Sequence, residues 1–166
     1  MAFIGLLSDT HGYLHPRVFD FFNPCHEVWH AGDIGSNVVE RLAGFKPLKA
    51  VYGNIDDAAI RAQCSEELHF TIDELKVYLT HIAGYPGKYN TKVRKKIKLI
   101  KPQLLVAGHS HILRVQYDEQ SKLLYINPGA AGLYGIHQKI TLIRFHIDGV
   151  NIHDLEVYET EKQALT

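Results

Sequence analysis

The segment Leu104-Leu105-Val106-Ala107-Gly108-His109-Ser110-His111 joins a short apolar run to two histidines that flank one serine. Four earlier clusters also follow runs rich in Val, Ile, Leu or Tyr, namely Asp9-Thr10-His11, Gly32-Asp33, Gly53-Asn54 and Thr80-His81. Such runs predict buried strands, so each cluster is expected where a strand ends. Because ligands bind beyond the carboxyl ends of strands in open α/β sheets, we expect the clusters to converge on one site. This convergence indicates a metal centre.

The residue types narrow the choice of metal. The clusters contain seven candidate ligands and no cysteine: Asp9, His11, Asp33, Asn54, His81, His109 and His111. Carboxylate, amide and imidazole donors suit manganese, iron, zinc, nickel or cobalt better than a thiolate zinc site or an all-oxygen calcium site. Seven ligands exceed what one catalytic metal takes from protein, because such a site keeps a position open for water or substrate. The set therefore predicts two divalent transition metals, with manganese as the first expectation.

The spacing of apolar residues predicts the order of strands and helices along the chain. Strands are expected over residues 3–8, 27–31, 49–52, 67–72, 76–80, 104–107, 112–117, 123–126, 139–147 and 151–158, and helices over 16–22, 36–43, 57–63 and 90–100. The first half alternates strand and helix, which is typical of parallel pairing, and the last third is rich in strands. Asp148-Gly149 predicts a hairpin turn between the last two strands. Two sheets covered by helices would accommodate both halves.

The order Asp-x-His, Gly-Asp, Gly-Asn, a lone His and Gly-His-x-His resembles the calcineurin-like metallophosphoesterases. Gly53-Asn54-Ile55-Asp56 is similar to the variant in their small single-domain bacterial and archaeal phosphodiesterases, and Asn127-Pro128-Gly129 is similar to a loop near their site. The resemblance implies an α/β fold, an αββα sandwich of two mixed β-sheets flanked by helices. It also implies that one metal is held by Asp9, His11, Asp33 and His111, and the other by Asp33, Asn54, His81 and His109. Asp33 would then bridge the metals, and the expected catalytic residues are Asp33, Asn54 and His109.

The same resemblance implies a metal-dependent phosphoesterase, and a phosphodiesterase in the first place. Two metals about 3.5–4 Å apart can clamp the attacking and leaving oxygens, and one can lower the pKa of its bound water towards about 7. The expected reaction is attack of a metal-activated hydroxide on a small-molecule phosphate ester. The alternative is a non-enzymatic protein-interaction scaffold, since a eukaryotic retromer subunit resembles this fold and works mainly by binding partners. The intact ligand set favours the enzyme, because a scaffold is free to lose it.

Single candidate ligands have simpler interpretations. Asp9 and Asp33 could be helix N-caps, Asn54 a turn residue beside Gly53, and His81 an ordinary histidine at a strand end. Five matching clusters in the right order favour the metal site over these interpretations. The histidines without a companion motif are expected to be ordinary: His15, His26, His69, His146 and His153. His30 lies on a predicted strand, where it either orients a ligand through a hydrogen bond or has no such role.

Position 55 departs from the pattern of the wider family. Many relatives place a histidine directly after Gly-Asn, where it protonates the leaving oxygen, but this chain has Ile55. An alkyl side chain donates no proton, and general acid catalysis is typically worth about 10²–10⁴-fold. The candidate substitutes are Asp56, Tyr85 and His137, and no spacing argument chooses between them. The sequence therefore predicts better turnover of leaving groups that need no protonation.

Composition and charge predict a compact enzyme of one domain. The 166 residues are 46% hydrophobic and 22% charged with a net charge of +0, which suits a single domain over residues 1–166 and gives no strong signal for nucleic acid. The basic helix expected over 90–100 is either a solvated face or a surface that steers an anionic substrate. Cys25 and Cys64 are isolated, and no run approaches the roughly 20 apolar residues of a membrane span. We therefore expect a cytoplasmic protein without membrane contact, and a homo-oligomer is compatible with the sequence.

Overall fold

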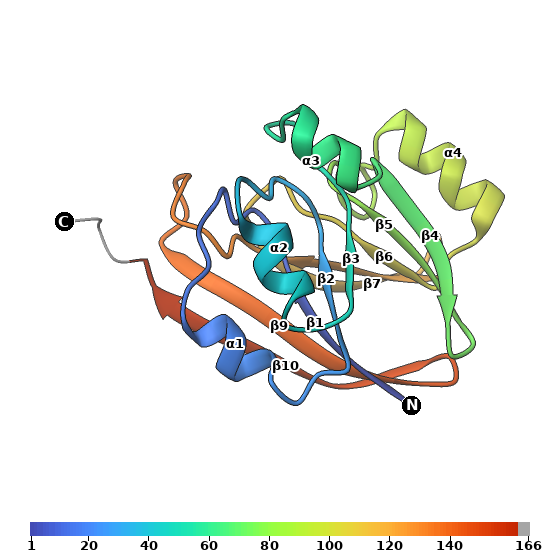
Figure 1. Ribbon diagram of the computed structural model, residues 1–166. Coiled ribbons are helices and arrows are strands. Elements are labelled where there is room, and N and C mark those ends of the chain that lie inside the picture. Colours follow the sequence, from blue (N-terminus) through green and yellow to red (C-terminus); the bar gives the residue numbers. More distant parts are fainter. Residues whose placement is uncertain (163–166) are drawn as a thin grey trace.

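A computed structural model describes residues 1–162 as two five-stranded β-sheets packed face to face (Figure 1). The first sheet has the strand order β10-β9-β1-β2-β3, formed by β10 (Asn151–Glu161), β9 (Lys139–Asp148), β1 (Ala2–Leu7), β2 (Glu27–His30) and β3 (Leu48–Ala50). The second sheet has the order β4-β5-β6-β8-β7, formed by β4 (Glu67–Ile72), β5 (Leu75–Thr80), β6 (Leu104–Val106), β8 (Leu123–Pro128) and β7 (Leu113–Asp118). Each sheet has a parallel core, β1-β2-β3 or β5-β6-β8, and antiparallel strands beside it.

The helices of the described chain flank these sheets: α1 (Arg17–Phe22), α2 (Val38–Ala43), α3 (Ala58–Gln63) and α4 (Thr91–Ile100). An apolar cluster between the sheets combines Leu6 and Trp29 of the first sheet with Val77 and Val106 of the second. Another cluster packs α1 and α2 on the outer face of the first sheet, and a further one packs α4 on the outer face of the second. Burial of these apolar faces drives the layers together. The predicted αββα sandwich is confirmed.

Each strand and helix predicted from the sequence is present in the described chain, and most bounds agree within two residues. The largest difference is at β10, which ends at Glu161 rather than at residue 158. Pairing with β9 continues along this polar end, where Lys139 and Glu159 form an ion pair at 2.9 Å. An apolar pattern carries no signal for such an extension. The predicted hairpin turn between β9 and β10 is confirmed, and Gly149 has a φ of 62° there.

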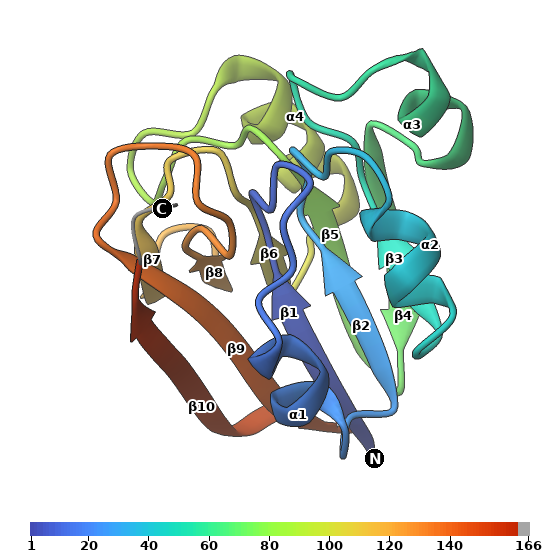
Figure 2. The same ribbon diagram turned by 60° about the vertical axis from the view of Figure 1, so that its left-hand side comes forward.

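The topology brings the ends of several strands to one side of the sandwich. The strands β1, β2 and β5 end at the same side (Figure 2), and β6 runs parallel to β5. The Asp9 N–H donates to the Gly32 carbonyl at 2.9 Å, and the Gly108 N–H donates to the His81 carbonyl at 3.0 Å. These hydrogen bonds join loops that follow different strands, so the loops hold one another in place. No helix among residues 1–162 has both the length and the apolar character needed to cross a membrane.

Candidate metal centre

The candidate ligands lie in two adjoining groups beyond the ends of β1, β2, β3, β5 and β6. One group consists of Asp9, His11 and His111, and the other of Asp33, His81 and His109. Within each group, one ligand atom from every residue lies within 4.8 Å of the others. Asn54 joins the second group, because its Oδ1 lies 3.1 Å from Nδ1 of His109. The convergence predicted from the strand-end pattern is therefore present in the structure.

Asp33 lies between the two groups. Its Oδ2 is 3.6 Å from His11 Nε2 and 3.2 Å from His81 Nε2. In the first group, Asp9 Oδ1 is likewise 3.2 Å from His111 Nε2. Donors that each lie about 2.0–2.2 Å from a shared ion are about 3 Å apart or slightly more. These spacings fit donor atoms that share an ion, and one oxygen of Asp33 lies near a histidine nitrogen of each group.

Unpaired buried atoms support metal binding. Among the described residues, the buried side-chain atoms without a hydrogen-bond partner are Asp9 Oδ1, His11 Nε2, His81 Nε2 and His146 Nδ1. An unpaired buried polar group costs about 1–3 kcal/mol, and three of these four atoms belong to the two ligand groups. A cation that accepts their lone pairs would remove this cost. The donor set therefore fits divalent transition metals.

One hydrogen bond leaves the ligating nitrogen of His81 free. Its Nδ1 lies 2.7 Å from the Ala31 carbonyl oxygen, and because that oxygen only accepts, Nδ1 bears the hydrogen of the neutral ring. The other nitrogen, Nε2, is then bare and faces Asp33 Oδ2. This is the tautomer that a metal-binding histidine needs, fixed from the far side of its ring.

The charges of the site favour the ligating protonation states of Asp9, Asp33 and His11, whereas they favour the protonated form of His81, whose proton a bound metal would displace. Burial opposes ionisation of Asp9 and Asp33, but neighbouring histidines and hydrogen-bond donors outweigh it and hold the pKa of each carboxyl below its usual range. Burial lowers the pKa of His11, against the pull of Asp33. Burial also opposes protonation of His81, but Asp33 and Asp9 prevail and raise its pKa. At neutral pH the two carboxylates are ionised and His11 is neutral, as metal binding requires.

Several of the candidate ligands have a left-handed backbone conformation. Ten non-glycine residues of the described chain have a positive φ, and five of them are candidate ligands: Asp9, His11, Asp33, His109 and His111. The left-handed region costs an ordinary residue about 1–3 kcal/mol and is concentrated at functional sites. Gly53 shows how tightly these turns pack, since a Cβ there would lie 2.8 Å from Cγ of Asp33. Sequence patterns gave no signal for these left-handed turns.

The simpler interpretations of single residues do not describe the aspartates. The N-cap residues of α1 and α2 are Pro16 and Asn37, so neither Asp9 nor Asp33 caps those helices. Asn54 does lie in a turn, as one interpretation held, and its side chain also reaches His109.

His30 joins two ligand-bearing loops. Its Nδ1 accepts the Gly32 N–H at 3.1 Å, so its Nε2 bears the hydrogen and donates to Thr10 Oγ1 at 2.9 Å. Thr10 Oγ1 in turn donates to the Ile34 carbonyl at 2.6 Å. Burial lowers the pKa of His30 to about 4 and keeps the ring neutral at pH 7. The hydrogen bonds of His30 go to Thr10 and Gly32 rather than to a candidate ligand, so His30 holds the two loops and does not orient a ligand side chain directly.

Other predicted residues have clear positions. Asn127 Nδ2 donates to the Gly108 carbonyl at 2.9 Å and to Ser110 Oγ at 3.1 Å, which places the Asn127-Pro128-Gly129 loop beside the Gly-His-x-His cluster.

His146 and His153, expected to be ordinary, lie within 4.8 Å of Asp154 at their ligand atoms. Their rings stack on each other at 5.4 Å. This stacking accounts for their proximity without a metal.

The structure also describes the three candidate general acids. Both oxygens of Asp56 accept backbone N–H groups, from Ile34, Gly35 and Gly53, at 2.8–3.0 Å. Tyr85 is exposed and lies under the Arg114 guanidinium, 4.9 Å from it. The two nitrogens of His137 face the Gly132 carbonyl at 2.8 Å and His111 Nδ1 at 3.3 Å. Asp56 and His137 therefore hold other groups in place, and sequence reasoning missed both contacts.

Comparison with known proteins identifies the family. Residues 2–149 match the model of the calcineurin-like phosphoesterase superfamily domain. A probable metallophosphoesterase of Methanothermobacter thermautotrophicus is 26% identical over 163 residues, which cover 95% of this chain and 92% of that protein.

Solved structures share the fold. A structure described as a novel archaeal phosphodiesterase has a TM-score of 0.74 at 22% identity and covers 94% of this chain and 99% of its own. The zinc complex of Vps29 from Entamoeba histolytica has a TM-score of 0.73 at 17% identity and covers 97% of this chain and 99% of its own. The family match and the metal-ligand groups agree with a metal-dependent phosphoesterase. The chain belongs to the calcineurin-like phosphoesterase superfamily.

Proposed function

We propose that residues 1–166 act as one metallophosphoesterase domain that hydrolyses a phosphodiester at a dinuclear metal centre. The observation that carries this proposal is the position of Asp33 Oδ2, within 3.6 Å of His11 Nε2 in one ligand group and 3.2 Å of His81 Nε2 in the other. A single carboxylate oxygen between two sets of bare nitrogens is the arrangement of a two-metal site.

Each group has a part in this proposal. Asp9, His11 and His111 would hold one metal and Asn54, His81 and His109 the other, while Asp33 would contribute to both. We assign the catalytic roles to Asp33, Asn54 and His109, as the family resemblance implies, and Asn54 also lines the adjoining cavity. When bound, two divalent ions would supply an activated water and positive charge at the phosphoryl oxygens. The protein side chains fix the positions of those ions and, through buried carboxylates, balance their charge.

The oxygen and nitrogen donors make manganese the first expectation, and nickel, cobalt, iron or zinc fit the same donors. The two cysteines of the chain are free, which is typical of proteins in a reducing compartment. On this basis we place the activity in the cytoplasm. Recovery of the protein mainly from a membrane or secreted fraction of its source cells would contradict this placement.

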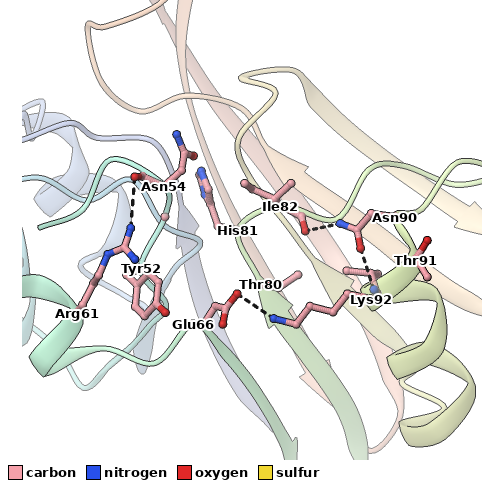
Figure 3. Close-up of a pocket in the computed structure, with 12 residues that line it drawn as sticks. Tyr52, Asn54, Arg61, Glu66, Thr80, His81, Ile82, Asn90, Thr91 and Lys92 are labelled. Atoms are coloured by element: carbon pink, nitrogen blue, oxygen red, sulfur yellow. Dashed lines mark hydrogen bonds and ion pairs between the residues drawn. The ribbon is translucent and has the colours of Figure 1, made fainter. Parts of the chain in front are cut away.

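A cavity next to the second ligand group supports an anionic substrate (Figure 3). It has a volume of about 450 Å³, and Asn54 and His81 form part of its wall. Arg61 also lines it, donating to the backbone carbonyls of Asp56 at 2.7 Å and Asn54 at 3.4 Å. Because these acceptors are uncharged, Arg61 keeps its full positive charge for a phosphate oxygen. One organic arm of a diester would occupy this cavity.

Lys92 contributes less to this charge. It lines the same cavity but forms an ion pair with Glu66 at 2.8 Å. Its neighbour one turn along α4, Lys96, pairs with Glu67 at 2.9 Å. Both pairs are at least partly exposed and are worth little individually. They favour the solvated-face interpretation of the basic helix over strong steering of substrate.

The missing proton donor shapes the substrate preference. Ile55 is 44% exposed in the position where many relatives carry a histidine, and the contacts of Asp56 and His137 occupy those side chains. The leaving oxygen would then depart without a proton from a side chain. We therefore propose that esters of acidic alcohols, such as aryl esters, react fastest.

A protein-interaction scaffold is the second candidate, and one surface favours it. The strand β7, at the edge of its sheet, exposes Leu113, Val115 and Tyr117, with Ile112 directly before it. Exposed apolar patches often mark contacts between proteins, and an edge strand offers unpaired backbone groups. A second copy of the chain could use the same surface. The complete ligand set still makes the enzyme the stronger proposal.

The proposal is tested with purified protein stripped of metal by a chelator and then reloaded. We expect hydrolysis of bis(para-nitrophenyl) phosphate to return with manganese, and with at least some of nickel, cobalt, iron and zinc. Hydrolysis of the corresponding monoester should be slower. Asp33→Asn should abolish turnover, while Asp57→Asn, the same change outside the ligand groups, should keep it. Full activity without metal would contradict the metal-dependent mechanism. No activity with any divalent metal on a broad ester panel would contradict the enzyme and leave the scaffold.

A further inference from the structure

A short loop after β8 covers the first ligand group. Within this loop, which runs from Gly132 to His137, His137 Nδ1 lies 3.3 Å from His111 Nδ1, and the two rings meet edge to face with centroids 5.1 Å apart. The Tyr134 ring lies 4.9 Å from the His11 ring. The loop thus contacts both histidines of the first group.

The hydrogen positions in this contact follow from the acceptor behind it. His137 Nε2 lies 2.8 Å from the Gly132 carbonyl oxygen, and because a carbonyl only accepts, Nε2 bears the hydrogen of a neutral His137. Its Nδ1 is then a bare acceptor. Since two bare nitrogens do not attract, the facing Nδ1 of His111 bears a hydrogen and donates it to His137.

The consequence reaches the metal group. A neutral His111 that bears its hydrogen on Nδ1 has a bare Nε2, and this is the atom 3.2 Å from Asp9 Oδ1. The loop also contacts Asp9 directly, because the Gly132 N–H donates to the Asp9 carbonyl at 3.1 Å. A closed path therefore runs from Asp9 through His111, His137 and Gly132 back to Asp9. It ties two ligands of one group to a loop that lies more than twenty positions further along the chain than His111.

The loop is shaped to admit this contact. Gly135 has a φ of 123°, and a Cβ there would lie 2.5 Å from His111 Nδ1 and 3.0 Å from His137 Nδ1. Any larger residue at this position would push the two rings apart. A glycine here is required by the pair of histidines as well as by the backbone.

We propose that His137 is a positioning residue, which accepts the Nδ1–H of His111 and so presents His111 Nε2 to the metal held with Asp9 and His11. This rests on the metal centre proposed above and adds a residue to it. His81 has the corresponding support from the Ala31 carbonyl in the second group. Supports of this kind typically change metal affinity about 10–100-fold. His137 acts on the first group alone, which makes its effect separable.

The first test is made on the wild-type protein loaded with zinc, which is diamagnetic. Nitrogen NMR of labelled histidines should show His111 protonated at Nδ1, His137 protonated at Nε2, and a scalar coupling between the two Nδ1 atoms across the hydrogen bond. A hydrogen on His137 Nδ1, or zinc on His111 Nδ1, would overturn the proposal. This measurement needs no variant and no activity.

The second test compares variants by metal titration. His137→Phe keeps the ring size but removes the acceptor, and it should weaken one of the two binding steps about 10–100-fold while leaving the other unchanged. His137→Asn retains an acceptor near the Nδ1 position and should recover most of that loss. His69→Phe, at an exposed position of β4, serves as the matched control. Equal weakening by the Phe and Asn variants, or of both steps, would overturn the positioning role.

The outcomes separate this proposal from the one beneath it. Two metal-binding steps in the wild-type protein, unchanged in His137→Phe, would remove the role of His137 and leave the metal centre intact. A wild-type protein that binds no divalent metal would remove the metal centre, and the role of His137 with it.

Discussion

Replacing Asp56 by Asn should destabilise the fold around the site, because Asp56 joins the two loops that carry Asp33 and Asn54. Its Oδ1 accepts the N–H groups of Ile34 and Gly35, both at 2.9 Å, and its Oδ2 accepts those of Gly53 at 2.8 Å and Ile34 at 3.0 Å. The whole Asp56 residue is 4% exposed.

The magnitude follows from these contacts. An asparagine has one acceptor oxygen, so whichever way it turns, its amide nitrogen faces the N–H of either Gly53 or Gly35. One charge-assisted hydrogen bond worth about 1.5–3 kcal/mol is lost, and a buried donor is left unpaired. We expect Asp56→Asn to lower the free energy of unfolding by about 2–4 kcal/mol, a large share of a typical total of about 5–15 kcal/mol.

The assay is urea unfolding of the metal-free proteins. The two free energies are compared only if the slope of free energy against urea concentration is the same in the variant and the wild type. The matched control is Asp57→Asn at the next residue, the N-cap of α3, whose side chain accepts the Ile60 N–H at 3.1 Å. Because asparagine caps helices about as well as aspartate, this variant should stay within about 0.5 kcal/mol of wild type. A stable Asp56→Asn variant with a steeper dependence on leaving-group pKa would refute the structural role and restore Asp56 as a proton donor.

Three further outcomes follow from the site. Asp33→Asn should reduce metal content at both positions, since a bridging carboxylate serves two cations, and elemental analysis showing near wild-type content would remove its bridging role. Ile55→His should flatten the dependence of rate on leaving-group pKa and help poor leaving groups most, by at most about 10²–10⁴-fold; equal slopes in a leaving-group series would argue against a missing acid at this position. The pKa of buried His30 is about 4 in the folded protein and 6.5 in the unfolded chain. The unfolded chain therefore takes up a proton first as the pH falls below 6.5. The metal-free protein loses about 3 kcal/mol of its free energy of unfolding between pH 6.5 and pH 4 for this reason. His30→Gln should reduce that loss in urea unfolding across this pH range, and an unchanged pH dependence would contradict it.

Much of the fold could be predicted because the apolar runs in the sequence coincide with the strands of the two sheets. The run from Leu104 to Val106 is buried throughout and is separated from Gly-His-x-His only by Ala107. The same change from apolar to polar residues marks the ends of β1 and β2. Parallel order then required those ends to meet. The polar end of β10 was missed because its pairing depends on β9 rather than on its own pattern.

The candidate metal ligands could be predicted from the sequence, but the hydrogen bonds that position them could not. Only a few residue types bind metals, so the spacing of aspartate, asparagine and histidine in the sequence predicts a metal site. Asp56, by contrast, reaches backbone groups 21–22 residues away, and a backbone N–H has no signature in the sequence. His137 meets His111 only because Gly135 leaves room for both rings. The left-handed turns at Asp9 and Asp33 likewise had no signal in the sequence pattern.

Anomalous X-ray scattering from crystals loaded with manganese tests the central claim most directly. We expect two manganese peaks about 3.5–4 Å apart, one beside Asp9, His11 and His111, the other beside Asn54, His81 and His109, with Asp33 between them. A single peak, or two peaks without Asp33 between them, would contradict a dinuclear centre in this protein.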